Sequence, residues 1–264
     1  MNNIFIEQKG IPSFVEIRAC SDIGGREEQQ DKAYVYTASS FVCAMICDGM
    51  GGTERGNDAS GIAVETLQSR LEEFVCRQNW ENVPHFMMST MMEQDERVVE
   101  KLGRRRGGTT AVTVFIKDKK LYWFSVGDSR LYIFRDGEMV QATRDHNYYL
   151  RLNEQLQKSE ITQTEYEKEA VRGEALISYM GVGGLSVYDI TNIPFDLQDK
   201  DVLLLTTDGL YKALPQSMIQ HIICDKGELS EKADTLLKQI GVLKKTKILD
   251  NTTFILIKVK GEEY

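Results

Sequence analysis

The chain has 264 residues, 42% of them hydrophobic and 27% charged, and 32 Lys and Arg against 40 Asp and Glu give a formal net charge of -8. This composition excludes a collagen-like, disordered or coiled-coil chain, and a chain of this length can bury about 75% of its unfolded surface without disulfides or structural metal. The acidic balance has the wrong sign for a protein that grips a phosphate backbone over a broad face, so we expect no nucleic-acid partner.

The N-terminal segment and the cysteines favour a cytoplasmic protein. Residues 1–14 have neither the basic start nor the apolar stretch of a signal peptide, and the longest apolar runs are strand-sized, so we expect no membrane segment. The cysteines are odd in number, scattered and without a C-x-x-C motif, which predicts buried free thiols in a reducing compartment. They are Cys20, Cys43, Cys47, Cys76 and Cys224.

Runs rich in β-branched and aromatic residues predict eight strands along the chain. Short turns such as Asp136-Gly137 join several of them into hairpins, which makes those neighbours antiparallel. The predicted strands cover residues 15–20, 32–37, 41–47, 110–117, 120–126, 130–135, 202–207 and 252–259.

Helical spacing appears in pairs of segments between these strands. Residues 57–79 and 84–102 form one predicted pair, and another pair begins at residue 212 and ends near residue 245. A polar stretch over residues 145–175 interrupts the strand pattern, and long excursions of this kind are usually functional or mobile. Blocks of strands with paired helices predict an α+β protein, with one compact domain as the simplest division.

Aspartates beside glycines lie at the ends of apolar strands. They are Asp48 before Gly49, Asp128 after Gly127 and Asp208 before Gly209, while Asp250 opens the last strand. Any single Asp-Gly pair could be a surface turn, but this repetition is hard to obtain from turn chemistry alone. If the strand ends converge, two carboxylates about 4 Å apart repel by roughly 4 kcal/mol at an effective dielectric of 20, and a divalent cation relieves that repulsion.

Oxygen ligands of this kind predict Mg²⁺ or Mn²⁺. Zinc is not expected, because the three histidines, His85, His146 and His221, show no metal-ligand spacing. Two such cations bridged by one carboxylate and a shared water can activate that water and clamp a phosphoryl oxygen. The pattern therefore favours phosphoester hydrolysis.

Seven segments in chain order resemble the signature motifs of the protein phosphatase 2C family, the metal-dependent serine/threonine phosphatases. They are SDIGGREEQQD, ICDGMGGTERG, GGTTAVTVF, FSVGDSRLYIFRDG, TRDHN, TTDGLYKAL and LDNTTFILIKV. The resemblance spans residues 15–259, and the DGMGG form is similar to the bacterial branch of the family. Motif order makes the resemblance far more specific than any one motif.

The resemblance implies an α+β fold, a four-layer αββα sandwich of two antiparallel β-sheets flanked by antiparallel helix pairs. It implies one catalytic domain over residues 1–264, with a flap at about 145–180 that borders the active site. We expect a monomer that removes phosphate from phosphoserine and phosphothreonine by direct attack of a metal-activated water, without a covalent phosphoenzyme. Its substrate would be a phosphorylated protein, paired with a cognate serine/threonine kinase.

The resemblance also implies the roles of individual residues. Asp48 would bridge two tightly bound Mn²⁺ or Mg²⁺ ions, with Asp208 and Asp250 completing one of them; these three form the expected catalytic set. Arg26 would grip the substrate phosphate, since its planar guanidinium suits bidentate recognition. The full expected metal-binding set is Asp48, Gly49 through its carbonyl, Asp208, Asp250, Asp31, and Asp128, which would hold a third, looser ion together with Asp208.

Two positions depart from the family pattern. Gln30 stands where Glu is common, which removes one negative charge and predicts weaker binding of a metal on that side. Met50 stands where eukaryotic members carry a histidine that protonates the leaving group, so the general acid is left open. His146 is a candidate for that role, although a structural histidine at the flap junction is the better interpretation.

Two alternatives to a phosphoprotein phosphatase remain at this stage. One is a non-catalytic regulator of the same fold that binds phosphorylated partners, favoured only by Gln30. Retention of Asp48, Asp128, Asp208 and Asp250 argues against that alternative. The other is an esterase for small phosphate metabolites, which the motifs do not distinguish from a protein phosphatase.

Overall fold

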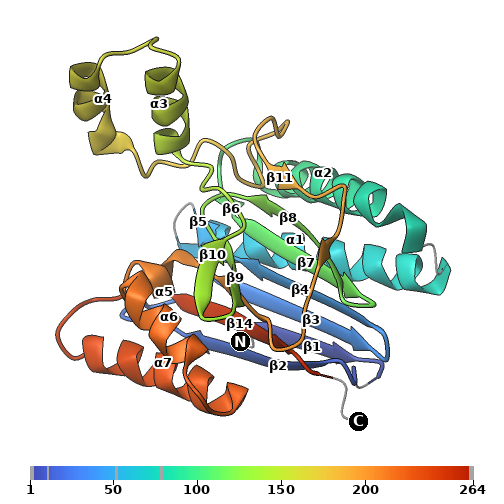
Figure 1. The fold of residues 1–264 in the computed structure, drawn as a ribbon. Coiled ribbons are helices and arrows are strands. Elements are labelled where there is room, and N and C mark those ends of the chain that lie inside the picture. The colour runs from blue at the N-terminus through green and yellow to red at the C-terminus, as the bar shows by residue number, and fades with distance from the viewer. Residues whose placement is uncertain (1–2, 11, 51–52, 78–79, 262–264) are drawn as a thin grey trace.

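Two β-sheets pack face to face and paired helices cover both outer faces (Figure 1). The structure is a computed structural model, and it describes all residues except 1–2, 11, 51–52, 78–79 and 262–264. Both sheets bring strand ends to one edge of the sandwich, where β5, β6 and α5 lie below the segment that carries α3 and α4 (Figure 1). This edge carries the candidate site.

The first sheet runs in the order β1-β3-β4-β7-β8-β11, and β12 also pairs with β8. All described pairings in it are antiparallel except that of β1 with β3, which is parallel. Its strands are β1 (Ile4–Gln8), β3 (Lys32–Ala38), β4 (Phe41–Cys47), β7 (Ala111–Lys117), β8 (Lys120–Val126), β11 (Asp189–Ile190) and β12 (Phe195–Asp196).

The second sheet has the order β10-β9-β13-β14-β2, and each of its described pairings is antiparallel. Its strands are β2 (Val15–Asp22), β9 (Arg130–Arg135), β10 (Glu138–Gln141), β13 (Val202–Thr206) and β14 (Thr252–Val259). A short ribbon of β5 (Gly49–Met50) and β6 (Gly108–Thr109) extends from the end of β4.

The helices follow the same division into layers. The first sheet is covered by α1 (Thr53–Arg77) and α2 (Val83–Leu102), with the 3₁₀ turn Trp80–Asn82 between them. The second sheet is covered by α6 (Gln216–Cys224) and α7 (Leu229–Leu243). A single turn, α5 (Asp208–Tyr211), directly follows β13.

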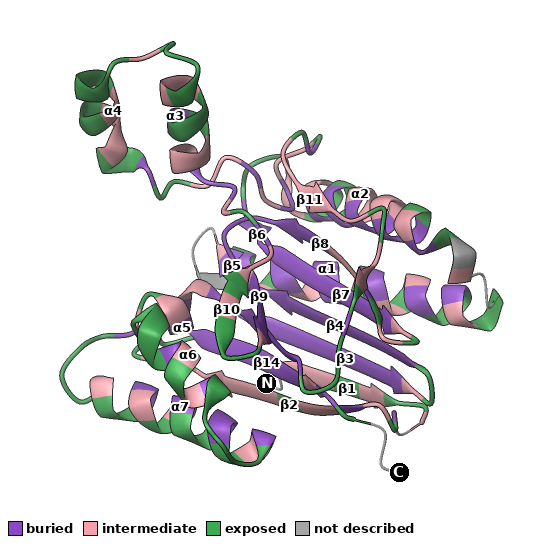
Figure 2. Cartoon of the chain, in the orientation of Figure 1, coloured by how far each residue is buried: buried purple, intermediate pink, exposed green. Residues whose placement is uncertain are grey.

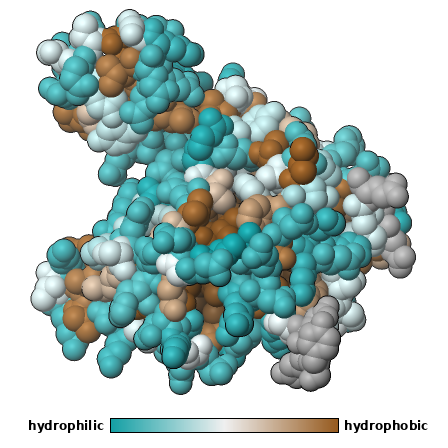
Figure 3. All heavy atoms as spheres, in the orientation of Figure 1, coloured by the Kyte–Doolittle hydropathy of each residue, from teal (hydrophilic) through white to brown (hydrophobic). Residues whose placement is uncertain are grey.

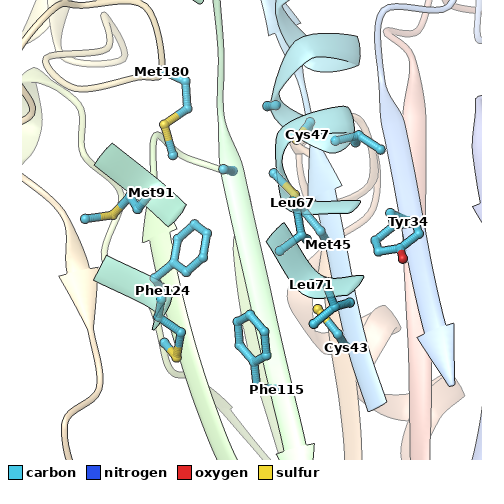
Figure 4. Close-up of a cluster of buried hydrophobic side chains, with 14 of the residues drawn as sticks. Tyr34, Cys43, Met45, Cys47, Leu67, Leu71, Met91, Phe115, Phe124 and Met180 are labelled. Atoms are coloured by element: carbon cyan, nitrogen blue, oxygen red, sulfur yellow. The ribbon is translucent and has the colours of Figure 1, made fainter. Parts of the chain in front are cut away.

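Three hydrophobic clusters correspond to the three interfaces between four layers. One lies between α1, α2 and the first sheet, one between the two sheets, and one between the second sheet and α6 with α7. Strand β4 contributes to two of them because successive side chains point to opposite faces. Its Cys43 and Met45 point toward the helices (Figure 4), whereas Val42 and Ala44 lie between the sheets. Figure 2 shows the central strands buried along their length.

The segment between residues 145 and 180 stands outside the four layers. It carries α3 (Tyr148–Gln157), α4 (Gln163–Glu169) and the 3₁₀ turn Ala170–Arg172. A capping box at Thr162 and Glu165 begins α4. Figure 3 shows this segment projecting from a largely hydrophilic face, with the surface notched beneath it.

The structure confirms the α+β sandwich and all eight predicted strands, each within a residue or two. It corrects one feature of the fold: β1, which the sequence analysis did not predict, makes the first sheet partly parallel. Of the five free cysteines, Cys43 and Cys47 are buried as expected, but Cys76 and Cys224 are exposed and Cys20 is half-buried. Among the described residues, no helix combines the length and apolar character needed to cross a membrane.

Candidate metal and phosphate site

A cavity of about 650 Å³ opens at the strand ends, and Glu174 and Leu176, which follow α4 in the chain, form part of its lining. The expected site residues that line it are Arg26, Asp48, Gly49, Asp128, Asp208 and Asp250. Asp31 is the exception, since it lies behind the wall of the cavity, buried and bound to Thr207. The fold thus brings side chains from distant parts of the sequence to one place.

The loop after β4 places Asp48 and Gly49 at the base of the cavity. The backbone N–H of Asp48 donates to the Thr110 hydroxyl at 2.9 Å, and its carbonyl accepts from the Thr109 hydroxyl and the Thr110 N–H, both at 2.9 Å. The two threonines of the GGTT motif therefore fix the backbone that carries this carboxylate.

Gly49 occupies a position that admits no side chain. A Cβ there would collide with the Gly56 carbonyl and lie 2.8 Å from the Gln30 carbonyl. Backbone from α1 and from the loop before β3 thus packs directly against Gly49. A glycine is required because the absence of Cβ permits this approach.

Asp208 begins α5 where β13 ends. The next residue, Gly209, packs so closely on the Asn251 carbonyl that a Cβ would overlap it. One residue before Asp208, the Thr207 hydroxyl donates to Asp31 Oδ2 at 2.9 Å, and the Thr253 N–H donates to Thr207 Oγ1 at 3.0 Å. These contacts join β13, β14 and the start of β3 at the site.

Asp250 and Arg26 meet at the exposed side of the cavity. Arg26 Nη2 donates to Asp250 Oδ2 at 2.7 Å, and this hydrogen bond is the main cause of the raised pKa of the guanidinium. Asn251 positions the loop of Arg26: its Nδ2 donates to the Ile23 and Glu28 carbonyls at 2.8 and 3.0 Å, and its Oδ1 accepts from the Gln30 N–H at 2.8 Å.

Asp128 is buried in the turn between β8 and β9. The Thr110 and Ser129 hydroxyls lie 2.7 Å apart, which ties this turn to the backbone of Asp48. His146 supports the same turn through two hydrogen bonds to Gly127. The imidazole Nδ1 accepts from the Gly127 backbone N–H at 3.2 Å, and the backbone N–H of His146 donates to the Gly127 carbonyl at 2.9 Å. His146 is fully buried and is not among the described residues that line the cavity.

Burial and mutual repulsion make the inner carboxyls weak acids. Burial raises the pKa of Asp48 well above its usual value, and the charges of Asp31, Asp208 and Asp128 raise it further. Burial likewise raises the pKa of Asp31 to about 7 and that of Asp128 to about 6. Asp31 Oδ1 is buried and has no hydrogen-bond partner among the described residues. Such a cluster retains protons or attracts a cation.

Lys212 lies against the other side of the cluster. Its Nζ is 2.9 Å from Asp208 Oδ2, 3.8 Å from Asp128 Oδ2 and 3.2 Å from Glu174 Oε2. Burial by itself would lower the pKa of Lys212, but the three carboxylates more than offset this and raise it. The surroundings of Lys212 therefore favour its charged form at the wall of the cavity.

The donor set fits a hard divalent cation, since it consists of carboxylate oxygens and the Gly49 carbonyl. The unpartnered Oδ1 of Asp31 and the raised pKa of Asp48 both show that the fold disfavours the ionised form of these carboxyls, which a bound cation would stabilise. Within the described part of the chain, no three Asp, Glu, His or Cys side chains converge as a finished coordination sphere. Asp208 and Asp250 each have one oxygen, Oδ2, hydrogen-bonded to Lys212 and Arg26 respectively.

Several residues of the site were not among those predicted from the sequence. Lys212 had a signal, because it lies four residues after Asp208 in a helical turn, the spacing at which opposite charges meet. Glu174 and Leu176 belong to the segment expected as the flap, and they line the cavity. Asn251 follows Asp250 directly, yet its role in holding residues 23–30 depends on tertiary contacts alone.

Comparison with known proteins gives a consistent result. The family described as protein phosphatase 2C matches residues 21–236 of this chain. The serine/threonine phosphatase stp of Listeria innocua is 30% identical over 220 residues, which cover 82% of each chain.

Solved structures share the fold. The serine/threonine phosphatase of S. agalactiae aligns with a TM-score of 0.77 and 24% identity, covering 94% of this chain and all of the other. The catalytic domain of the serine/threonine protein phosphatase PstP, solved in complex with two manganese ions, aligns with a TM-score of 0.68 and 22% identity, over 94% of this chain and 99% of that one.

Proposed function

The chain belongs to the protein phosphatase 2C family and is a protein serine/threonine phosphatase, and we propose that the cavity at the strand ends is where it hydrolyses phosphoserine and phosphothreonine side chains. One observation carries this assignment: Asp48, Asp128, Asp208 and Asp250 come from separate strand ends and line the same cavity as Arg26. A cluster of carboxylates beside a guanidinium suits metal ions and a phosphate together.

Phosphatases of this family depend on metal ions, and we propose Mn²⁺ or Mg²⁺ at a binuclear centre. Asp48 would bridge the pair, the Gly49 carbonyl would bind one ion, and Asp208 with Asp250 would complete the other, with Asp31 behind them. When bound, such a pair activates water for direct attack on phosphorus and polarises the phosphoryl oxygens. A third ion would need both Asp128 and Asp208. The two manganese ions of PstP support this proposal.

The protein's own groups bind and orient the substrate. The Arg26 side chain is more than half exposed at the cavity mouth, where its planar donors can receive the phosphate. The loop of Arg26 is held by Asn251, so its guanidinium stays next to Asp250. We propose direct attack by water without a covalent phosphoenzyme, in which the carboxylates that line the cavity serve as metal ligands.

The substrate that fits this chemistry is a phosphorylated protein, and we propose that a serine/threonine kinase in the same cytoplasm supplies it. We further propose that residues 1–264 act as a monomeric single catalytic domain, with residues 145–180 as a flap over the site. Glu174 and Leu176 of that segment line the cavity, which supports a role in substrate selection. Insertions that border a site are where specificity commonly resides.

The decisive test is phosphate release from a phosphothreonine peptide and, in parallel, from a small chromogenic phosphate ester. We expect turnover of the peptide with Mn²⁺ and none in excess chelator, with recovery when Mn²⁺ or Mg²⁺ is added back. Full activity in chelator would contradict the metal mechanism. Hydrolysis of the ester alone would indicate a small-molecule esterase, and binding of the peptide without hydrolysis would indicate the non-catalytic regulator.

A further inference from the structure

Lys212 places an ammonium group where Asp128 and Asp208 would have to share a third metal ion. Its Nζ lies 2.9 Å from Asp208 Oδ2 and 3.8 Å from Asp128 Oδ2, so one cation already contacts both carboxylates. These carboxylates are largely enclosed, with side-chain exposures of 10% for Asp128 and 17% for Asp208. Enclosed opposite charges are screened less than surface ion pairs.

The position of Lys212 is built into the local fold. Its N–H donates to the Asp208 carbonyl at 2.9 Å, which closes one helical turn and directs the side chain back over Asp208. The preceding residue, Tyr211, donates its hydroxyl to the Asp128 carbonyl at 2.9 Å and lies under the Arg130 guanidinium at 3.6 Å. The backbone around Lys212 is therefore anchored to both carboxylate-bearing segments.

A third carboxylate completes the surroundings of the ammonium. Glu174 Oε2 lies 3.2 Å from Lys212 Nζ, and Glu174 follows α4 and the 3₁₀ turn Ala170–Arg172. Three carboxylates from three chain segments thus surround one ammonium, which donates a hydrogen bond to Asp208 Oδ2 and forms ion pairs with Asp128 and Glu174. A divalent ion placed between Asp128 and Asp208 would have to displace this ammonium or lie beside a fixed positive charge.

We propose that Lys212 is a built-in cation that takes the place of a third metal ion, so that the enzyme binds two metals, and that it ties the α3–α4 segment to the site through Glu174. Lys212 is a positioning residue in this inference, which rests on the proposed binuclear centre. It fixes the orientation of Asp208 and Asp128 and limits the metal stoichiometry.

The test counts Mn²⁺ ions on the full chain by calorimetry and by electron paramagnetic resonance of free Mn²⁺. We expect two sites in the unchanged protein and no third site at millimolar Mn²⁺. Lys212→Met keeps the length of the side chain and removes its charge, so a third, weaker site should appear. That site should be lost again in Lys212→Met combined with Asp128→Asn. Lys168→Met, on the exposed face of α4, is the matched control and should still bind two ions.

Hydrogen exchange of α3 and α4 provides a second readout. Glu174→Gln should raise exchange there while the Mn²⁺ count stays at two, whereas Lys212→Met should change both. Lys212→Gln repeats the test with a polar side chain, in case the apolar one disturbs the fold. A third Mn²⁺ in the unchanged protein, or an unaltered count in both folded Lys212 variants, would overturn the inference. Fewer than two sites in the unchanged protein would instead overturn the proposed function, and the inference with it.

Discussion

The inner and outer carboxylates of the site deal with negative charge in different ways. The outer pair, Asp208 and Asp250, contacts Lys212 at 2.9 Å and Arg26 at 2.7 Å. In the inner pair, Asp31 and Asp48, burial is the largest cause of the raised pKa of both carboxyls. The charges of neighbouring carboxylates raise both pKa values further. The protein thus compensates the outer charge with its own cations and leaves the inner charge to protons or to a metal.

Removing charge from the inner pair should have the largest effect. Asp48→Asn deletes the proposed bridging carboxylate at a position that contributes no apolar core volume, so we expect activity to fall by more than about a thousandfold, equivalent to ~4 kcal/mol in the barrier. The free energy of unfolding should change little. Steady-state kinetics and thermal unfolding measure the two quantities.

The control for this variant is Asp136→Asn, which alters another Asp-Gly pair in the hairpin between β9 and β10. Asn tolerates the positive φ of 52° at that turn, so activity should be unchanged. Equal activity of Asp48→Asn and the parent protein would place the reaction elsewhere.

Removing an outer cation should cost less, and mainly in binding. Arg26→Ala deletes a group that contacts phosphate in the ground and transition states alike, so KM should rise at least as strongly as kcat falls. We expect kcat/KM to fall by roughly 10- to 100-fold, about 1.4 to 2.7 kcal/mol. Arg77→Ala, at the exposed end of α1, is the control. A drop in kcat with unchanged KM would show that Arg26 acts on the chemistry and not on binding.

Adding charge near the inner pair should have a smaller effect of opposite sign. Gln30 lines the cavity, and its N–H is fixed by Asn251. Gln30→Glu adds a negative charge there, so the half-saturating Mn²⁺ concentration should fall severalfold, where tenfold would correspond to about 1.4 kcal/mol. Metal titrations of activity and calorimetry both report this concentration. The control is Gln157→Glu, which adds the same charge at an exposed position at the end of α3, away from the cavity.

The three possible results for Gln30→Glu have different meanings. A lower Mn²⁺ requirement supports the expected weakness of metal binding on this side. An unchanged requirement would place Gln30 beyond the electrostatic reach of the metals. A higher requirement would mean that the neutral side chain holds a hydrogen bond that the carboxylate breaks.

The pH dependence of unfolding tests the charge of the inner pair without any substitution. The pKa of Asp31 is about 7 in the fold and 3.8 in a free side chain, so the folded state holds a proton that the unfolded state has lost. The stability associated with that proton is fully present at a pH below the pKa of Asp31 in the unfolded state. It is lost as the pH rises through the pKa of Asp31 in the folded state. In chelator, Tm should therefore fall by several degrees between about pH 5 and pH 8. One pKa unit corresponds to ~1.4 kcal/mol of stability, and ~1 kcal/mol moves the Tm of a protein of this size by about 2–4 °C.

Two companion measurements sharpen this result. Mn²⁺ should raise Tm most at the alkaline end, where the inner carboxylates are ionised and protons no longer compete for them. Asp31→Asn should flatten the pH dependence of Tm. A metal-free Tm that rises from pH 5 to pH 8 would contradict the charge assignment of the inner pair.

The sequence predicted the fold and the site best where a single strand and the aspartate that follows it can be recognised from neighbouring residues alone. The apolar run that forms β4 ends directly before Asp48, and the run that forms β13 ends two residues before Asp208, so both features can be read locally. That these ends meet was an inference from charge repulsion and family resemblance. The meeting itself depends on sheet order, which places β13 between β9 and β14.

Features that depend on distant partners were missed for that reason. Strand β1 pairs in parallel with β3, and the chain reaches that position only after passing through β2 in the other sheet. Parallel neighbours need such a crossover, which no hairpin signal announces. The contact of Lys212 with Asp208 is local, but its contact with Glu174 joins segments that no periodicity relates.

The role of Asn251 has a consequence for protein synthesis. Asp250 and Asn251 precede the last strand, β14, yet Asn251 holds the loop of Arg26, and β14 pairs with β2 along its whole length. A ribosome delivers the N-terminal half first, so a nascent chain carries Arg26 and Asp48 long before the residues that organise them arrive. We therefore expect the site to form only after Asp250, Asn251 and β14 have been synthesised, and a chain truncated before Asp250 to lack activity.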